Sequence, residues 1–234
     1  MTREGARHPT LLAWSSGKDS AYALHVLRKR PDVEVVGLLT TINQTYDRVA
    51  MHAVRLSLLE AQAEAAGLPL FLARIPSPCP NEVYEKAMAA ALEDAVARGV
   101  RAVAFGDLFL EDVRRYREER MKASGLELLF PLWGRPTRAL AEEMIASGLR
   151  ARLSCVDPKK LDRSFAGREF SRELLRDLPE DVDPCGENGE FHSFAWDGPM
   201  FRHPVPVRSG ELVERDGFVF ADLLPESAPA LAAS

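Results

Sequence analysis

The sequence predicts an α/β protein in which a doubly wound, mostly parallel sheet is followed by a smaller C-terminal α+β region. Three observations predict this class. Short apolar runs alternate with segments of helical periodicity through the first two thirds of the chain, glycines end several of the helical segments, and the chain beyond Asp157 is richer in proline, glycine and aspartate. Alternating strands and helices imply right-handed crossovers, which place the strands parallel to one another.

Each element of the first part has its own signal. The apolar run Thr10–Trp14 is too short for a helix, and the helical spacing that begins at Lys18 stops at Pro31. Val33–Leu39 is continuously apolar, which suits a strand buried on both faces. The same signals predict helices over Ala50–Ala66 and Val83–Ala97 and strands over Leu70–Ile75 and Val100–Phe105.

The elements beyond Gly106 are more mixed. We expect helices over Leu110–Ser124 and Thr137–Ser147, strands over Leu126–Leu132 and Arg150–Val156, and short strands near 190–196, 204–207 and 217–223. The chain therefore divides into a nucleotide-type α/β domain over residues 1–130 and a smaller region over residues 131–224. Residues 225–234 are expected to form a disordered tail.

The composition excludes several classes of protein. The chain has 234 residues and a formal net charge of -5, which argues against a broad nucleic-acid surface. It has no apolar run of membrane-spanning length and no signal-peptide core at its charged N-terminus. Three cysteines without a CxxC pair make neither a disulfide framework nor a cysteine zinc site. We expect a reduced, soluble, cytoplasmic protein that binds neither membrane nor nucleic acid.

The segment from Trp14 to Ser20 lies between the first expected strand and the first expected helix. A loop in that place presents unpaired backbone N–H groups and the positive end of the helix to an anion. The segment also supplies hydroxyl donors, a glycine and a positive charge, from Ser15, Ser16, Ser20, Gly17 and Lys18. The alternative is an ordinary turn in which Ser16 or Asp19 only caps the helix.

A second constellation, the 183–193 segment, holds two glutamates, a histidine and two glycines in one short stretch. If a strand begins at Glu190, then Glu190 and His192 point to the same face, and Glu187 lies on the turn before it. An acid and an imidazole on one face can orient a nucleophile, move a proton or bind a metal. The alternative is a tight hairpin with solvated acids and a structural histidine.

The three cysteines have plain interpretations. We expect Cys185 to be a small buried turn residue rather than a nucleophile, because no histidine partner is placed beside it by sequence. Cys79 is expected to be an exposed loop thiol, and Cys155 a core residue of its strand.

Both segments resemble known motifs. Ser15–Ser20 resembles the pyrophosphate loop, SGGxDS, of the PP-loop ATP pyrophosphatase superfamily, with Ser16 where a glycine is usual. The 183–193 segment resembles the CGExGEFHT signature of the diphthine–ammonia ligase family, a branch of that superfamily, from which Asn188 and Ser193 depart. Other pieces that resemble this family are His52, Gln62–Glu64, Gly67–Leu70, Phe105–Asp107, Arg117–Glu118, Pro131–Trp133 and Asp197–Phe201.

The resemblance implies ATP-dependent amide formation: a carboxylate attacks the α-phosphate of ATP, pyrophosphate leaves, and ammonia displaces AMP. It implies that residues 1–130 bind ATP and residues 131–224 bind the acceptor. The implied nucleotide-binding residues are Ser15, Ser16, Gly17, Lys18, Asp19, Ser20, His52, Gly106 and Asp107. The implied catalytic residues are Lys18, Asp19, Glu187, Glu190 and His192, and Asp19 would help to bind Mg²⁺. Which of Glu187, Glu190 and His192 moves the proton stays open.

The implied partners are ATP, ammonia and an acceptor carboxylate on a small molecule or a protein. In an archaeal or eukaryotic cell the acceptor would be elongation factor 2. Arginine outnumbers lysine 24 to 6, a pattern typical of GC-rich bacterial genomes, where a different acceptor would be needed. A homodimer is left open. The alternatives are a PP-loop tRNA-modifying enzyme and a sensor that binds ATP without turnover.

Overall fold

The computed structural model describes residues 7–43, 48–49, 54–76 and 78–226. Its first sheet contains the parallel strands β1 (His8–Ala13), β2 (Val33–Asn43), β4 (Leu70–Ile75), β5 (Ala102–Ala104) and β6 (Glu127–Leu129). Their spatial order is β4-β2-β1-β5-β6, and the short β3 (Arg48–Val49) pairs antiparallel with the end of β2. The chain therefore winds one way from β1 and the other way from β5. Such a reversal opens a crevice at the carboxyl ends of the two central strands, where ligands of open α/β sheets bind.

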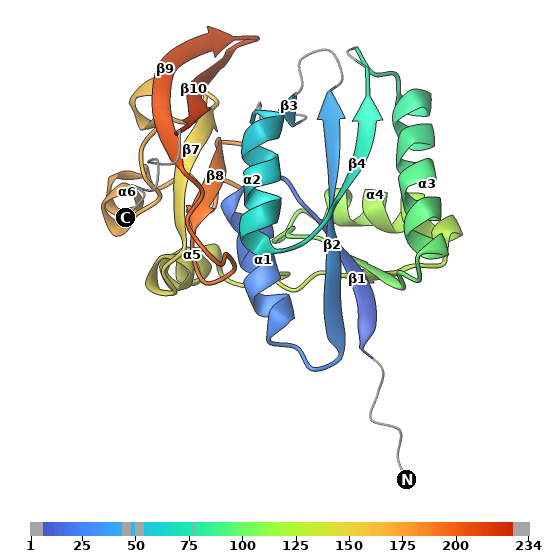
Figure 1. The fold of residues 1–234 in the computed structure, drawn as a ribbon. Helices are drawn as coiled ribbons and strands as arrows, with labels where there is room; N and C mark the ends of the chain where they lie inside the picture. Colours follow the sequence, from blue (N-terminus) through green and yellow to red (C-terminus); the bar gives the residue numbers. More distant parts are fainter. Residues whose placement is uncertain (1–6, 44–47, 50–53, 77, 227–234) are drawn as a thin grey trace, which may run out of the picture.

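Helices cover both faces of this sheet (Figure 1). Adjacent residues of β1 face opposite sides, so Leu12 packs with α1 (Lys18–Arg28) and α2 (Leu56–Ala66), whereas Leu11 packs with α3 (Asn81–Ala97). The charged helix α4 (Glu111–Met121) follows β5 and ends in a 3-10 turn over Lys122–Ser124. This two-sided burial confirms the doubly wound α/β class and explains why the central strands are continuously apolar.

The second sheet is antiparallel and has the order β8-β7-β10-β9. Its strands are β7 (Arg150–Val156), β8 (Phe191–Asp197), β9 (Val207–Arg215) and β10 (Phe218–Pro225). α5 (Thr137–Ala146) precedes it, and the 3-10 turn Arg163–Phe165 and α6 (Arg172–Asp177) lie between β7 and β8. This sheet is the expected smaller α+β region.

The two sheets share one hydrophobic core, with α1 and α2 between them (Figure 1). Backbone hydrogen bonds cross the junction: the N–H of Ala195 in β8 donates to the Ser16 carbonyl at 2.9 Å, and the N–H of Arg202 donates to the Ala65 carbonyl at 2.7 Å. β8 therefore lies directly against the N-terminal end of α1, which brings the 183–193 segment to the crevice.

Several predicted boundaries are wrong in detail. α2 begins at Leu56, and residues 50–53 of the helix expected over Ala50–Ala66 lie outside the described residues. The short strand expected near 204–207 is instead β9, which begins at Val207 and is much longer. The tail expected from residue 225 overlaps β10, which ends at Pro225, and residues 227–234 lie outside the described residues. None of the described helices is both long and apolar enough to cross a membrane.

Candidate active site

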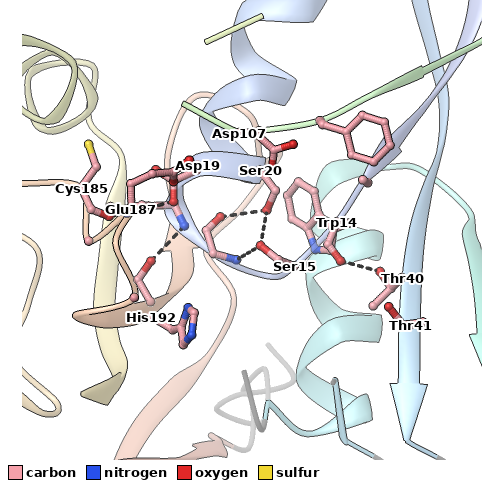
Figure 2. Close-up of a pocket in the computed structure, with 18 of the residues that line it drawn as sticks. Trp14, Ser15, Asp19, Ser20, Thr40, Thr41, Asp107, Cys185, Glu187 and His192 are labelled. Atoms are coloured by element: carbon pink, nitrogen blue, oxygen red, sulfur yellow. Dashed lines mark hydrogen bonds and ion pairs between the residues drawn. The ribbon is translucent and has the colours of Figure 1, made fainter. Parts of the chain in front are cut away.

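A cavity of about 520 Å³ opens at the carboxyl ends of β1, β2 and β5. It is lined by the loop after β1, by Leu39–Thr41 of β2, by Phe105–Asp107 after β5 and by parts of the 183–193 segment. Figure 2 shows Asp19, Glu187 and Cys185 close together on one side of it, with Trp14 and Thr40 on the other. The two segments that the sequence singled out therefore face one cavity.

The loop Ser15–Ser20, here called the phosphate loop, leads directly into α1. Gly17 is the N-cap residue of α1, and no side chain makes a capping hydrogen bond there. The hypothesis that Ser16 or Asp19 only caps the helix is therefore wrong. Serine hydroxyls brace the loop: Ser15 Oγ accepts from the Gly17 N–H at 3.3 Å, and Ser20 Oγ donates to the Gly17 carbonyl at 3.0 Å. A helix start of this kind is a site for an anion.

Two glycines allow the loop to lie close to its neighbours. A Cβ on Gly17 would be 3.3 Å from the Ser193 carbonyl oxygen of β8. A Cβ on Gly106, at the end of β5, would be 3.1 Å from the backbone of Asp19 and Ser20. Larger residues at these positions would push β5 or β8 away from the first turn of α1.

Ser16, at the position where the resembling motif has glycine, has a left-handed backbone with φ of 70°. Its carbonyl accepts hydrogen bonds from the Ala195 N–H and from Gln62 Nε2, and its side chain is fully buried. Its Oγ has no hydrogen-bond partner among the described residues. Serine therefore neither crowds the cavity nor donates into it, since Ser16 is not among the residues that line it.

Ser16→Gly is expected to raise the free energy of unfolding by about 1 kcal/mol. The change removes a left-handed serine and a buried unsatisfied hydroxyl, and the greater freedom of glycine in the unfolded chain offsets part of the gain. Denaturant unfolding measures the difference. Ser16→Ala is the matched control: it removes the hydroxyl but keeps the strained backbone, so it should gain less. A loss of stability in Ser16→Gly would contradict the strain.

Lys18 links the phosphate loop to the 183–193 segment. Its side chain is 2% exposed, and Nζ donates to Asp19 Oδ2 at 2.9 Å and to the Cys185 carbonyl. The rings of Phe170 and Phe191 lie 5.5 and 5.2 Å from Nζ. Burial favours the neutral amine, but the surrounding acidic groups, Asp19 foremost, together outweigh it and raise the pKa of Lys18 above its usual value. Lys18 is thus a charged, buried residue in the cavity wall, and its hydrogen bonds hold the phosphate loop against the 183–193 segment.

Asp19 fits the role of a magnesium ligand in part. Oδ2 is occupied by Lys18, whereas Oδ1 is buried and has no hydrogen-bond partner among the described residues. Within the described residues, no group of three or more His, Cys, Asp or Glu side chains could hold a metal by itself. Mg²⁺ commonly takes one or two carboxylates and completes its coordination with substrate phosphates and water, which suits a single free carboxylate oxygen.

Glu187 joins the 183–193 segment to the loop after β5. Its Oε1 accepts a hydrogen bond from the Leu108 N–H at 2.8 Å. Burial, together with the nearby negative charges of Asp19 and Asp107, raises the pKa of Glu187 to about 7. The turn that presents it is built around Asp183, whose Oδ2 accepts from the N–H groups of Cys185 and Glu187 at 3.1 and 3.0 Å. Glu187 is a cavity-lining carboxyl that can exchange a proton near neutral pH.

Glu190 is built into the segment rather than presented to the cavity. β8 begins one residue later, at Phe191, and Glu190 is 3% exposed. Its Oε1 accepts from the Asp183 N–H at 3.0 Å and from Asn188 Nδ2 at 3.2 Å. The strand expected to begin at Glu190 begins instead at Phe191, so the condition under which Glu190 and His192 would share a face is not met, and Glu190 is not among the described residues that line the cavity.

His192 and Ser193 of β8 do line the cavity. Burial, and to a lesser degree the charge of Lys18, lowers the pKa of His192 to about 4. Its imidazole is therefore neutral at pH 7. Ser193 Oγ accepts from the Lys18 N–H at 3.1 Å, so this departure from the usual threonine keeps the hydroxyl that the loop uses.

Arg117 of α4 is a cation at the cavity that the sequence did not place among the predicted site residues. Arg117 of α4 donates to Asp107 through Nε at 2.5 Å and through Nη2 at 3.0 Å, and its guanidinium lies 4.4 Å from the Phe105 ring centroid. Both Asp107 and Arg117 line the cavity. The carboxylate of Asp107 is thus engaged by a bidentate ion pair. The match of Arg117–Glu118 to the family motifs was the signal in the sequence that could have identified Arg117 as a site residue.

The remaining candidates have simple outcomes. Gly106 lies at the cavity, as expected, and His52 lies outside the described residues. Cys185 is buried, and its Sγ lies 3.4 Å from the Thr137 carbonyl oxygen. Burial raises the pKa of this thiol far above its usual value, so it stays neutral and unreactive. Cys155 is a core residue whose pKa burial raises to about 12, whereas Cys79 is partly rather than fully exposed.

The fold and the site define a class of protein. A parallel sheet whose order reverses beside β1, with a serine- and glycine-rich loop opening α1 at the reversal, is the architecture of the PP-loop α/β proteins. The chain belongs to the diphthamide synthase family, whose N-terminal domain model matches residues 9–128 and whose C-terminal domain model matches residues 136–220. This relationship identifies it as a ligase and confirms the resemblance found in the motifs.

Similar proteins carry one name. The diphthine–ammonia ligase of Bos taurus is 30% identical over 234 residues, covering 88% of this chain and 85% of the relative. That of Homo sapiens is 30% identical over 236 residues with the same coverage. That of Danio rerio is 33% identical over 178 residues, 68% of each chain.

Proposed function

We propose that this chain is an ATP-dependent amide ligase that forms AMP and pyrophosphate, joining ammonia to an acceptor carboxylate. The observation that carries the proposal is the meeting of two different chemistries in one cavity. The open N-terminus of α1 with its serine hydroxyls suits a pyrophosphate, and a carboxyl with a pKa of about 7 lies across the same space.

The phosphate loop would hold the pyrophosphate part of ATP. The first turn of α1 and the serines Ser15 and Ser20 line the cavity, and Arg117 adds a cation to the same lining. These groups stabilise the charge that develops as the bond between the α- and β-phosphates breaks. Bound Mg²⁺ would neutralise phosphate charge, and Asp19 Oδ1 is the protein oxygen placed to help hold it.

Glu187 is the best-placed proton acceptor for the second half of the reaction. Ammonia attacks the acyl-adenylate carbonyl, its nitrogen becomes positively charged, and a proton must leave as AMP departs. Glu187 lines the cavity with a pKa near neutrality, whereas the His192 imidazole is a weak base with a pKa of about 4 and Glu190 is turned into its own segment. We therefore propose that Glu187 accepts the proton and that His192 orients the substrate.

The name that these relatives share suggests the acceptor. We propose diphthine, a carboxylate-bearing side chain of elongation factor 2, as the acceptor in an archaeal or eukaryotic cell, and another carboxylate of similar reach elsewhere. The reaction would take place in the cytoplasm, where ATP and ammonia are both present. Whether two copies associate stays a prediction.

A pyrophosphate-release assay tests this function. Protein, ATP, Mg²⁺ and ammonium, supplied with purified elongation factor 2 carrying diphthine, should release AMP and pyrophosphate in equal amounts and add an amide to the acceptor, detected by mass spectrometry. Release of ADP would contradict the proposed bond cleavage. ATP binding without pyrophosphate release under any acceptor would favour the sensor, and release that depends on tRNA would favour the tRNA-modifying enzyme.

A further inference from the structure

Gln62 makes an unusual set of contacts for a core residue. It lies on α2, is fully buried, and is not among the described residues that line the cavity. Its Oε1 accepts from Trp14 Nε1 at 3.0 Å, and its Nε2 donates to the Ser16 carbonyl at 3.0 Å and to the Ala195 carbonyl at 2.6 Å. One amide therefore ties together the end of β1, the phosphate loop and β8.

The contact with Ser16 controls the direction of a peptide group. In a trans peptide the carbonyl and the following N–H point in opposite directions. The Ser16 carbonyl points to Gln62 and to the Ala195 N–H, away from the cavity, so the Gly17 N–H points toward the cavity side, where Ser15 Oγ accepts it. With this peptide turned over, a carbonyl oxygen would face the anion site and repel a phosphate.

Other conformations of the loop compete with the observed one because the observed backbone is strained: in them Ser16 returns to a negative φ and its carbonyl leaves Gln62. A left-handed backbone costs a serine about 1–2 kcal/mol, and such a conformation persists only where its surroundings hold it. At Ser16 the holding groups are two hydrogen bonds to its carbonyl, one of them from the Gln62 side chain. A glycine at this position would adopt the same backbone with little cost.

We propose that Gln62 is a positioning residue for phosphate binding, which fixes the Ser16–Gly17 peptide with its N–H toward the anion against the strain of a left-handed serine. The inference rests on the proposed function, since it takes the loop to bind the pyrophosphate part of ATP. Gln62 does not touch the nucleotide and acts only through the loop.

The test separates this role from ordinary core packing. Gln62→Met keeps the volume and removes the hydrogen bonds, and we expect it to weaken binding of inorganic pyrophosphate and of ATP about tenfold, a loss expected for one well-placed hydrogen bond. Calorimetry measures both affinities, and kinetics should show the KM for ATP rising more than kcat falls. Met144→Ala is the matched control, because it destabilises a buried position of α5 that does not line the cavity and should leave both affinities unchanged.

A double substitution tests the link to Ser16. If Gln62 holds the strained backbone of Ser16 in place, Ser16→Gly should restore part of the lost pyrophosphate affinity in the Gln62→Met background, because glycine adopts that backbone at little cost, so the two changes are not additive. Gln62→Glu serves if Gln62→Met does not fold. It keeps the acceptor for Trp14 but turns an oxygen toward two carbonyls, so its pyrophosphate affinity should be low at pH 8 and recover as the carboxyl is protonated.

The outcomes distinguish the two claims. Unchanged pyrophosphate and ATP affinity in a folded Gln62→Met, or strictly additive effects with Ser16→Gly, would overturn the positioning role while leaving the proposed function intact. A wild-type protein that binds no pyrophosphate would refute both. Wild-type turnover together with a specific loss of affinity in Gln62→Met, and rescue by Ser16→Gly, supports both.

Discussion

Lys18→Met is expected to lower the free energy of unfolding by about 3–5 kcal/mol and to abolish ATP turnover. Methionine fills the space of the lysine stem between Phe170 and Phe191 but removes the ammonium. The Asp19 carboxylate and the Cys185 carbonyl then lose their shared donor inside the protein, and a buried charge left without its partner carries a cost of this size. Denaturant unfolding and the pyrophosphate-release assay measure the two effects.

The matched control is Lys29→Met, which makes the same chemical change at an exposed lysine just after α1. It should alter stability by less than about 0.5 kcal/mol, as most surface substitutions do. If Lys18→Met proved as stable as Lys29→Met, the buried hydrogen bonds of Lys18 would not contribute to the stability of the fold. Loss of turnover without loss of stability would indicate that Lys18 acts only by binding phosphate.

Glu187→Gln is expected to lower kcat by about 10²- to 10⁴-fold, the range for removing a general base. Glutamine keeps the oxygen that accepts from the Leu108 N–H, so the segment stays docked and ATP affinity is retained. Glu187 accepts protons only when ionised, so wild-type kcat should rise with pH through about 7, and this limb should be absent in the variant. Both profiles share any dependence on ammonium, which cancels in their ratio.

Glu187 should also make the free energy of unfolding depend on pH. Folding raises the pKa of Glu187, so the native state holds this proton more tightly than the unfolded state. Its contribution to stability is present below the unfolded pKa and is lost as pH rises through about 7. Glu187→Gln should therefore flatten the decline in stability between pH 5 and 8. Glu180→Gln, at an exposed position, should alter neither profile, and a pH-rate limb that survives in Glu187→Gln would move the base elsewhere.

Much of the nucleotide half was predictable from sequence because it rests on local patterns. Continuous apolar runs and helical spacing gave the parallel strands, and the position of the phosphate loop after the first strand placed it at the crevice. The motif match then brought the 183–193 segment to the same site. Its placement beside α1 could not follow from periodicity, because it depends on contacts such as that between Ser193 and the Lys18 N–H.

The errors have physical reasons. The alternating pattern predicts a strand from about Glu190, but β8 begins at Phe191. The turn before it includes Gly189, whose φ of 81° is not that of an extended strand. The sequence predicted a positive charge at Lys18 but not its burial, because its partners are a neighbouring carboxylate and a carbonyl from 167 residues away. Asp107 lines the cavity as expected, but its bidentate ion pair with Arg117 of α4 depends on a contact ten residues away that no local pattern predicts.

The contact between β8 and the phosphate loop constrains how this chain can evolve. The two family-model regions are separate along the sequence, yet Ser193 and Ala195 of the second form the underside of the loop in the first. The halves are therefore not interchangeable modules. Because Ser16 contacts both Gln62 and Ala195, we expect substitutions in the loop and in β8 to be coupled, and a chimera that joins the two regions from distant relatives should lose these contacts first.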